Sequence, residues 1–582
     1  MELTEAGWAV FRSRYAQKDD TGKVIESPAE AVWRIANAAA LAEKPLQRAS
    51  WAEKFAAIID QKKFIPSTPI WANVGKPERP WQPSACFVLA VEDSLESMYE
   101  TLKQTALVCK WGGGVGFNFS SIRPRGDFIR STKGRASGVV ELIRLYDASA
   151  AMVKQGGIRR GAFMGILNVD HPEIFDFINA KKEGGLENFN LSVGITDSFM
   201  EAVFNQGEWS LKFRGETRRT VKARDLWEAI VNAAWACGDP GLIFLDRLQE
   251  ANPVPGNLLN ATNPCGEQPL SPGESCLLGS INLAQIVTAE KGIAKINWEE
   301  LAAITEVALR FLDNLIDVAQ YPLAFIGEKS RATRKVGLGV LGLHDLLIRL
   351  RLPYDSHEGR QKAREVLRHI RLTAYRYSAQ LAREKGCFPQ WKDSIFYPTQ
   401  PMRNASCITI APTGTITLLA GTEGYGIEPI FAVAYRKETE AGTIPVFSSL
   451  FRHFCNQHRV PERALDEVAA KGSCQGVAGI PDQLQKLFKG AYEIAPEDHL
   501  AMQIELQQEV DNAISKTINL PLTSTVEDLD FIYKRAFTGR LKGITVFRAG
   551  SKPGVITLGD LGEKPSLSCS SRWICTGCED PS

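Results

Sequence analysis

The residues Asn263 to Glu267, which read Asn-Pro-Cys-Gly-Glu, restrict the local fold of this 582-residue chain more than any other stretch. Pro264 has no amide hydrogen and Gly266 is a poor helix former, so the stretch is predicted to be extended or looped rather than helical. Alternate side chains of an extended segment point the same way, so Asn263, Cys265 and Glu267 would project from one face. An amide, a thiol and a carboxylate on one face indicate thiol chemistry with a base beside it; the alternative is a loop with a packing cysteine.

A second cysteine, Cys276, begins the apolar run that follows. The wording of residues 263–270, Asn-Pro-Cys-Gly-Glu-Gln-Pro-Leu, resembles the active-site finger loop of ribonucleotide reductases, in particular the adenosylcobalamin-dependent class II enzymes. The resemblance implies that Cys265 carries a transient thiyl radical and that Asn263 and Glu267 act on the ribose of a ribonucleotide. The implied product is a 2′-deoxyribonucleotide.

The composition is that of an ordinary soluble globular protein, with 44% hydrophobic and 23% charged residues. The formal net charge of +1 gives no reason to expect nucleic-acid or membrane binding through bulk electrostatics. No run of about eighteen apolar residues occurs and the N-terminus does not resemble a signal peptide, so we expect a cytoplasmic protein. Twelve cysteines scattered over such a chain do not predict a structural disulfide framework.

Residues 1–65 are predicted to form a helical N-terminal region. Five aromatic residues are expected to be its buried anchors: Trp8, Phe11, Tyr15, Trp33 and Trp51. The nucleotide-sensing ATP-cone of many ribonucleotide reductases would need many further residues, so an on/off adenine-nucleotide site is not expected.

The main domain is expected to span residues 66–548. Short apolar runs alternate with helix-like segments between residues 160 and 260, which indicates βα units, so periodicity alone predicts only an α/β fold. The family resemblance implies more: a ten-stranded α/β barrel, with the finger loop near residues 263–276 threaded through its centre.

The segment that enters this domain is expected to contribute to substrate binding. By resemblance, Thr68, Ser84 and Ala85 would touch the substrate. Cys86 opens an apolar run and by itself is best interpreted as a core thiol. The resemblance makes it the redox partner of Cys276, although the sequence cannot show that two residues so far apart meet.

Residues 111–117, Trp-Gly-Gly-Gly-Val-Gly-Phe, form a glycine-rich run that matches neither a dinucleotide-binding fingerprint nor a P-loop. We expect these glycines to allow a close approach of two backbone segments rather than to bind phosphate on their own.

A second turn of small residues lies late in the chain. A predicted strand ends before Pro412, Thr413 and Gly414, and a helix is predicted to start at about Thr415. Free amides at a helix start bind phosphate; the alternative is a capped helix without a ligand. The resemblance favours the phosphate of the substrate.

Two loops rich in glycine and basic residues, 130–137 and 155–161, flank a helix predicted over residues 138–154. Each is either a solvated basic turn or a polyphosphate site. In the family that the chain resembles, helices in these positions build a homodimer, and the loops hold a deoxynucleotide or ATP effector and relay its identity to the substrate. The residues that this resemblance implicates are Asp93, Arg130, Lys133, Gln155, Arg159 and Arg160.

Residues 549–582 are expected to be a flexible tail, because they are rich in Gly, Pro, Ser and charged groups. The tail carries a Cys-x-x-Cys motif, Cys575 and Cys578, with Cys569 nearby and no histidine. Zinc normally needs four ligands, so thiol–disulfide exchange with a thioredoxin- or glutaredoxin-like protein is favoured over zinc binding. No metal is expected to be ligated by the protein itself.

The radical source is chosen by resemblance and elimination. Class I large subunits receive the radical through paired tyrosines near the C-terminus, where this chain has Val546 and Phe547, and a class III glycyl-radical loop is lacking. Adenosylcobalamin remains. The alternatives are a class I-type large subunit that needs a metal-containing partner, and a catalytically silent nucleotide-binding paralogue. A silent paralogue should have lost some of the five catalytic residues, all of which are present.

Overall fold

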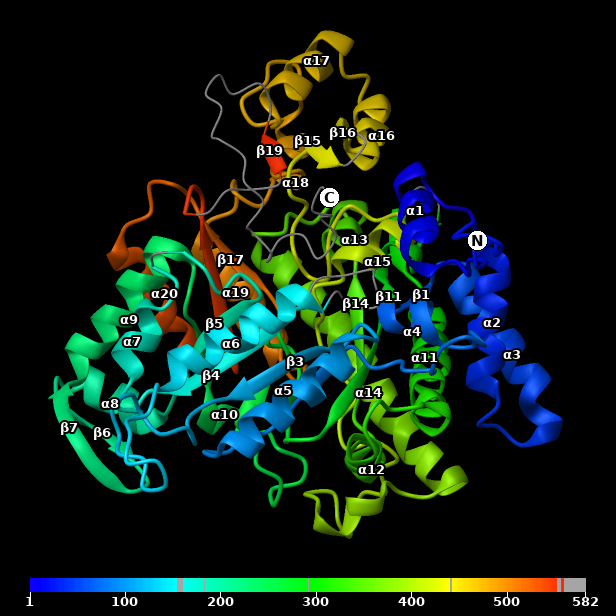
Figure 1. Ribbon diagram of the computed structural model, residues 1–582. Coiled ribbons are helices and arrows are strands. Elements are labelled where there is room, and N and C mark those ends of the chain that lie inside the picture. Colours follow the sequence, from blue (N-terminus) through cyan, green and yellow to red (C-terminus); the bar gives the residue numbers. More distant parts are fainter. Residues whose placement is uncertain (154–160, 183, 291–292, 440–441, 552–555, 559–582) are drawn as a thin grey trace.

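The N-terminal region is helical, as its sequence predicts (Figure 1). A capping box starts α2, since the amides of Ser27 and Glu30 each donate to the other residue's side chain. The helices are α1 (Glu5–Val10), the π-helical turn η1 (Phe11–Tyr15), α2 (Pro28–Ala40), η2 (Pro45–Gln47) and α3 (Arg48–Asp60). The computed structural model describes residues 1–153, 161–182, 184–290, 293–439, 442–551 and 556–558.

The predicted aromatic anchors of this region are only partly correct. Phe11 and Tyr15 are fully buried, and Trp8 and Trp51 are half-buried. The prediction for Trp33 is wrong, because its side chain is 46% exposed. Smaller residues of α2, including the fully buried Ile35, form the face that packs on the core, and Trp33 is turned away from it.

The first half of the central barrel is a parallel sheet in the order β2-β3-β4-β5-β8. Its strands are β2 (Cys86–Val88), β3 (Gly114–Asn118), β4 (Phe163–Asn168), β5 (Phe189–Ile195) and β8 (Gly241–Phe244). These strands are mostly apolar and buried, as expected for parallel strands covered on both faces. Helices lie outside them: α5 (Leu95–Cys109), α6 (Val139–Met152), α7 (Ile174–Asn179), α8 (Asp197–Phe204), α9 (Ala223–Cys237) and α10 (Leu245–Glu250).

The second half is also parallel. Its strands are β11 (Ser275–Asn282), β14 (Val336–Leu341), β17 (Thr517–Leu520) and β18 (Gly543–Arg548). Bridges from Leu338 to Ile408 and from Ile410 to Ile514 link β14 to the segment that leads into β17, through the predicted strand before Pro412. The outer helices of this half are α11 (Trp298–Val318), α12 (Ala324–Thr333), α13 (Leu343–Arg349), α14 (His357–Lys385), α19 (Pro496–Gln507) and α20 (Val526–Thr538).

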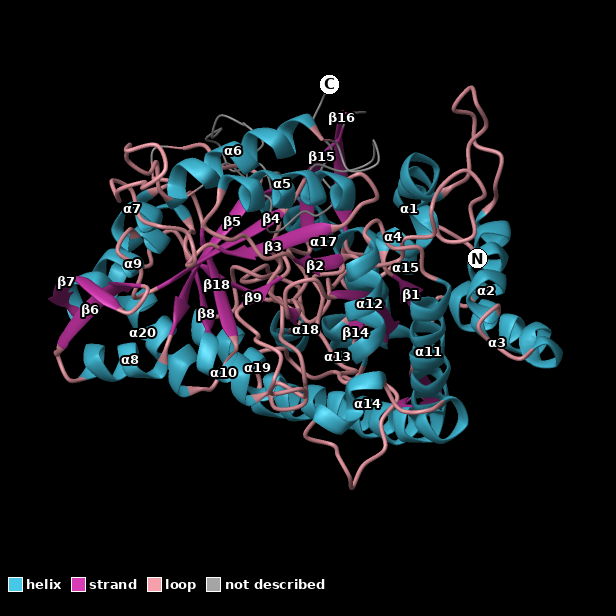
Figure 2. Ribbon diagram, turned by 60° about the horizontal axis from the view of Figure 1, so that its bottom comes forward, coloured by secondary structure: helices cyan, strands magenta, loops and turns pink. Residues whose placement is uncertain are grey.

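Two antiparallel junctions close the halves into a barrel. β2 pairs with β11 at one junction, and β8 pairs with β18 at the other. Ten named strands belong to this mixed sheet. They include β1 (Phe64–Pro66), which pairs with residues 279–281 of β11, beyond the residues of β11 that pair with β2. The predicted ten-stranded α/β barrel is therefore confirmed (Figures 1 and 2).

The finger loop is a hairpin inside this barrel, between β9 (Ala261–Thr262) and β10 (Pro269–Leu270). The glycine-rich run on β3 makes room for it, as its sequence predicts. A Cβ on Gly116 would lie 1.7 Å from the carbonyl oxygen of Thr262, and one on Gly114 would lie 2.8 Å from Pro264. No side chain larger than hydrogen fits at either position.

The N-terminal helices and the barrel share one hydrophobic core. The rings of Phe55 on α3 and Phe311 on α11 meet edge to face at 5.4 Å. A buried ion pair of 2.7 Å joins Glu43, which follows α2, to Arg310 on α11. The predicted boundary near residue 65 therefore does not separate two cores.

Smaller elements complete the fold. A cap with its own aromatic core of Phe451, Phe454 and Phe488 lies at the top of Figure 1. It comprises β15 (Ala434–Thr439), β16 (Gly442–Phe447), α16 (Ser449–Gln457), α17 (Glu462–Lys471) and α18 (Asp482–Leu487). Elsewhere lie α4 (Thr68–Asn73), β6 (Glu208–Phe213), β7 (Glu216–Lys222), η3 (Leu283–Gln285), β12 (Val287–Glu290), β13 (Ile293–Ile296), η4 (Pro389–Asp393) and α15 (Gly414–Ala420). In the part of the chain that the structure describes, no helix is long and apolar enough to cross a bilayer.

Part of the predicted flexible tail departs from expectation. Ile556–Leu558 forms the short strand β19, which pairs antiparallel with β15 of the cap. The run contains an Ile and a Thr, and β-branched residues of this kind favour strands. Residues 552–555 and 559–582 lie outside the described residues.

Candidate active site

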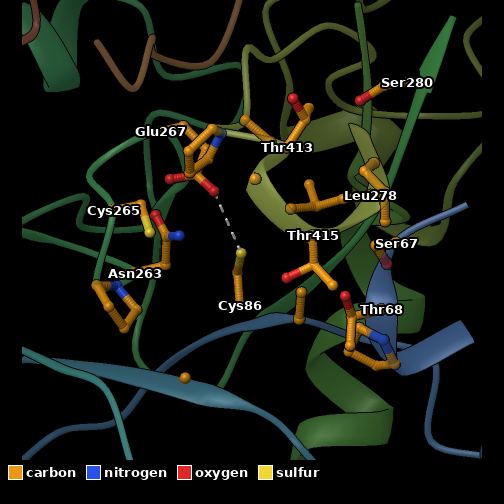
Figure 3. A pocket seen from close by; sticks show the side chains of 18 of the residues that line it. Ser67, Thr68, Cys86, Asn263, Cys265, Glu267, Leu278, Ser280, Thr413 and Thr415 are labelled. Atoms are coloured by element: carbon orange, nitrogen blue, oxygen red, sulfur yellow. Dashed lines mark hydrogen bonds between the residues drawn. The ribbon is translucent and has the colours of Figure 1, made fainter. Parts of the chain in front are cut away.

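The finger tip, β2, β11 and the starts of α4 and α15 surround one pocket (Figure 3). All three finger residues singled out in the sequence line it: Asn263, Cys265 and Glu267. Asn263 and Glu267 are each only 2% exposed, whereas Cys265 is half-buried. Figure 3 shows the three side chains on one side of the pocket.

The backbone conformation of the finger tip differs from the extended segment that the sequence predicts. The amide of Gly266 donates to the carbonyl of Asn263 at 3.0 Å, and Gly266 has a φ of 81°, so residues 263–266 form a turn. The Oδ1 atom of Asn263 accepts from the amide of Gln268 at 2.9 Å, which fixes the base of this turn. The three side chains thus line one pocket because of a turn, and the alternation argument is wrong.

Both halves of the barrel hold the finger in place. Asn190 on β5 donates from Nδ2 to the carbonyl of Pro264 at 2.9 Å. From the other half, the hydroxyl of Thr409 and the amide of Ala513 donate to the carbonyl of Glu267 at 2.8 and 3.0 Å. Contacts on both sides of the loop fix the Cys265 thiol relative to both sheets.

Cys86 brings a second thiol to the same pocket. Its sulfur lies 3.9 Å from Oε1 of Glu267, the contact marked in Figure 3. Cys276 stands directly opposite Cys86 in the β2–β11 ladder, and both lie in the same interior cluster without a disulfide between them. Burial above all, with the nearby Glu267 and Glu274 carboxylates, raises the pKa of Cys276 well above its usual value. The thiol of Cys276 therefore stays protonated at neutral pH.

Of the three substrate contacts predicted at the entry to the main domain, two line the pocket and one does not. Thr68 is the first residue of α4 and lines the pocket, as does Ala85. Ser84 is fully buried but is not among the described residues that line the pocket, so a direct substrate contact is not supported for it. Its hydroxyl lies 3.0 Å from that of Ser275, on β11.

The predicted phosphate turn also reaches the pocket. Pro412, Thr413, Gly414 and Thr415 all line it. The helix, α15, starts at Gly414, one residue before the predicted start. Thr413 adopts a left-handed φ of 59° and accepts a hydrogen bond of 2.7 Å from the amide of Gly426 through its hydroxyl oxygen, so the turn is fixed.

Several pocket residues were not identified from the sequence. Ser67 precedes α4, and its buried hydroxyl has no hydrogen-bond partner within the described residues. Leu278, Gly279 and Ser280 belong to β11 and line the pocket as well. The sequence shows that they belong to the apolar run after Cys276, but it does not show that this run pairs with β1, whose end leads into Ser67 and α4 at the pocket.

The predicted effector residues do not line this pocket in the described part of the chain. The carboxylate of Asp93 accepts from Arg123 and Arg214, at 2.9 and 2.8 Å. Arg130 and Lys133 are exposed in the loop before α6. Gln155, Arg159 and Arg160 lie outside the described residues, as do the tail cysteines Cys575 and Cys578. Within the described ranges no group of His, Cys, Asp and Glu could hold a metal ion.

Comparison with known proteins decides the family. The model of the ribonucleotide reductase barrel domain matches residues 84–397 and 395–547, and that of the ribonucleotide reductase all-alpha domain matches residues 1–79. The chain belongs to the ribonucleotide reductase family.

Relatives within this family agree in sequence and in fold. The chain is 43% identical to a vitamin B12-dependent ribonucleoside-diphosphate reductase of Mycobacterium tuberculosis, over 99% of this chain and 84% of the relative. It is 37% identical to a protein of the same name from Thermoplasma acidophilum, over 95% of this chain and 80% of the relative. The Actinobacillus ureae class Id ribonucleotide reductase alpha subunit has the same fold, with a TM-score of 0.77 and 22% identity over 94% of this chain and 97% of that chain.

Proposed function

We propose that this chain reduces ribonucleoside diphosphates to 2′-deoxyribonucleotides, with adenosylcobalamin as its radical source. One observation carries the proposal: Cys265, Glu267 and Cys86 line one pocket, and Cys86 has a second thiol, Cys276, opposite it. The names of the Mycobacterium and Thermoplasma relatives support both the diphosphate substrate and the cobalamin cofactor.

The side chains of the finger suit the first half of the reaction, in which the ribose loses its 3′-hydrogen atom. A thiyl radical at Cys265 removes the hydrogen atom from C3′ of the ribose and becomes a thiol. Glu267 accepts the proton of the 3′-hydroxyl, and Asn263 holds the ribose by hydrogen bonds. Because the finger is anchored to both sheets, Cys265 and Glu267 keep a fixed relation during this step.

Cys86 and Cys276 suit the second half of the reaction, in which the 2′-hydroxyl leaves and the ribose is reduced. A thiol of the pair protonates the 2′-hydroxyl, which leaves as water, and the two thiols together supply two electrons and end as a disulfide. Cys265 then returns a hydrogen atom to C3′ and is again a thiyl radical. One ribonucleotide and two thiols thus give one deoxyribonucleotide, one disulfide and one water. The raised pKa of Cys276 keeps its proton available for this transfer.

The finger tip can accommodate a large cofactor beside Cys265. Cys265 is only half-buried, and a Cβ built on Gly266 would meet no heavy atom within 4 Å. Pro264, Cys265 and Gly266 would face the cofactor. When bound, adenosylcobalamin supplies an organic radical through its weak cobalt–carbon bond.

Val546 and Phe547 argue against a class I-type large subunit. They lie on β18, are 2% and 6% exposed, and carry no phenol that could pass a radical from a partner subunit. The purified protein should reduce a ribonucleoside diphosphate when adenosylcobalamin and a dithiol are added, and should be inactive without the cofactor. Activity that depends instead on a metal-containing partner protein would overturn the cofactor assignment. A parallel assay with triphosphates tests the substrate.

The substrate would lie between the finger and the starts of α4 and α15. Thr68 and Ala85 lie on one wall, and the turn from Pro412 to Thr415 supplies hydroxyls and backbone amides suited to the phosphates.

Homodimer formation through α5 and α6 is part of the proposal. The two helices expose five large apolar side chains, namely Leu95, Tyr99, Leu107, Leu145 and Met152. Such a surface supports a second copy of the chain as its cover. A deoxynucleotide or ATP effector would bind at the adjacent loop that contains Arg130 and Lys133. The reductant would be a thioredoxin- or glutaredoxin-like protein that acts through Cys575 and Cys578.

A further inference from the structure

The π-helical turn η1 places a residue of the all-α region against the substrate pocket. Tyr15 ends this turn and is fully buried. Its hydroxyl lies 3.1 Å from the hydroxyl of Thr68, the first residue of α4, which lines the pocket. We infer that Tyr15 is a positioning residue that fixes the Thr68 hydroxyl for the nucleotide, and that the segment α1–η1 sets substrate affinity. The inference rests on the proposed function.

Tyr15 is itself held from two directions. Its ring packs on Trp71 of α4, with ring centroids 6.0 Å apart. The Nζ atom of Lys76 donates to the carbonyls of Tyr15 and Ala16 at 2.9 and 3.3 Å. Lys76 is only 2% exposed, so these bonds are shielded from water. The Tyr15 hydroxyl therefore has little freedom to leave Thr68.

Either hydroxyl of the Tyr15–Thr68 pair can be the donor, and we take Tyr15 as the donor. A hydroxyl group can donate one hydrogen bond and accept two. When Tyr15 donates to Thr68, the single proton of Thr68 remains for an oxygen of the bound nucleotide. A buried donor also polarises the hydroxyl to which it is bonded, which strengthens the next hydrogen bond in the chain.

The same N-terminal segment supports the other wall of the pocket. Helix α1 packs against α15, which begins at the predicted phosphate turn (Figures 1 and 2). The approach is so close that a Cβ built on Gly7 would lie 2.8 Å from the carbonyl oxygen of Leu418 on α15. One continuous segment, α1–η1, therefore touches both pocket helices, through Gly7 and through Tyr15.

The residues proposed to act on the ribose lie on the opposite side of the pocket from Thr68 (Figure 3). Figure 3 shows Thr68 across the pocket from Cys265 and Asn263, which come from the finger. A change at Tyr15 should therefore alter nucleotide binding and leave the chemical step nearly unchanged. This separation distinguishes a positioning role from a general loss of structure, because a misfolded protein would lose both.

The test is a double-mutant cycle with nucleotide affinity as its readout. Calorimetric titration of the reduced protein with a ribonucleoside diphosphate needs no turnover. Tyr15→Phe should raise Kd and KM by about 2- to 10-fold, the worth of one hydrogen bond, with kcat changed by less than about twofold. Thr68→Val should do the same, and the double variant should bind no more weakly than Thr68→Val alone.

Tyr533→Phe is the matched control. Tyr533 is also fully buried, packs on a tryptophan, Trp227, at 6.3 Å, and donates its hydroxyl to a carbonyl, that of Pro240, at 3.1 Å. Tyr533 lies on α20 and does not line the pocket. Tyr533→Phe should therefore lose about as much thermal stability as Tyr15→Phe, and its Kd for the nucleotide should be unchanged.

Gly7→Ala probes the second contact and serves if Tyr15→Phe does not fold. It should raise Kd by displacing α15. Unchanged Kd in Tyr15→Phe or in Gly7→Ala, or full additivity in the cycle, would overturn the inference while the wild type still reduces nucleotides. A wild type that binds no ribonucleotide would instead overturn the proposed function together with it.

Discussion

Cys86 on β2 and Cys276 on β11 are direct partners in an antiparallel pair of strands. The Cα atoms of such partners lie about 4.5 to 5.5 Å apart, which is within the range of disulfide-bonded cysteines. Both side chains are buried in the barrel interior, and no disulfide joins them in this structure. The pair can therefore close to a disulfide, and open again, with little movement of either strand.

A single turnover should convert this pair into a disulfide. When the reduced protein receives substrate, effector and cofactor but no reductant, peptide mapping should find Cys86 linked to Cys276, in proportion to the deoxynucleotide formed. Replacing either cysteine by serine should remove both the linkage and the product. Cys474→Ser, a buried thiol of the cap, is the control and should leave both unchanged. Product formed without the disulfide would contradict the assignment.

Cys265→Ser should abolish turnover and leave nucleotide affinity nearly unchanged, because a serine hydroxyl cannot host an accessible radical. Cys387→Ser is matched to it, since Cys387 is likewise half-buried but lies between α14 and η4. That control should retain wild-type turnover. The thiyl role would be excluded if Cys265→Ser kept more than about a tenth of wild-type turnover. Such a loss corresponds to an increase of less than about 1.4 kcal/mol in the activation free energy.

Lys76 should make stability depend on pH. Burial, followed by the nearby Arg34 and Arg79, lowers the pKa of Lys76 from 10.5 to about 7. Between these two values the unfolded chain binds the extra proton and the folded chain does not, so stability rises as pH rises from about 7 toward 10. For one proton the slope is at most about 1.4 kcal/mol per pH unit.

Lys76→Met should remove this contribution. The midpoint of thermal unfolding, measured from pH 7 to 9.5, should rise less with pH in the variant than in the wild type. It should also be lower overall, because the carbonyls of Tyr15 and Ala16 lose their donor. Lys18→Met removes an exposed lysine that also donates to a carbonyl, that of Ser13, and should keep the wild-type pH dependence. Parallel curves for the wild type and Lys76→Met would refute the prediction.

The loop before α6 should carry effector specificity. In the wild type, changing the added effector should re-rank the ribonucleotide substrates. Arg130→Ala with Lys133→Ala should weaken effector binding by about a hundredfold or more, since each charge-assisted hydrogen bond contributes on the order of 1.5 to 3 kcal/mol and the double variant loses two of them. Arg463→Ala with Lys486→Ala removes two exposed charges from the cap and should have no effect. Substrate preferences that are the same under all effectors would remove the allosteric hypothesis.

The sequence predicted elements whose determinants are local. The turn chemistry of Pro264 and Gly266 correctly excluded a helix, and the glycines of β3 correctly predicted a close backbone approach. The helix predicted over residues 138–154 is α6, which spans Val139–Met152. The barrel itself did not follow from periodicity, because the antiparallel closures of β2 on β11 and of β8 on β18 join strands far apart in the chain.

The same limit applies to the site. That Cys86 and Cys276 meet is a property of strand register, which no local pattern contains. Substrate contacts are predicted from the sequence for both Ser84 and Ala85, and only Ala85 is among the described residues that line the pocket. The finger residues were assigned to one face through an extended backbone, whereas a turn at Gly266 brings them together. Tyr15 was expected to be a core anchor, and its contact with Thr68 required the tertiary structure.

The last prediction concerns Cys575 and Cys578, which lie outside the described residues. β19 pairs with the cap, so Leu558 is the last described point before them. The stretch from Leu558 to Cys575 could span on the order of 50 Å if extended. Serine at both positions should block repeated turnover with a protein dithiol as reductant. One round should persist, because Cys86 and Cys276 begin reduced.

A small dithiol such as dithiothreitol should restore cycling in this double variant, because it can enter the pocket that Cys86 lines without help from the tail. Burst amplitude and steady-state rate, measured with each reductant, separate the two cases. The zinc alternative predicts a different pattern, with about one metal ion per chain in the purified protein and loss of that metal in the double variant. Stoichiometric zinc, or normal cycling of the double variant with the protein dithiol, would show that Cys575 and Cys578 do not carry the reducing equivalents.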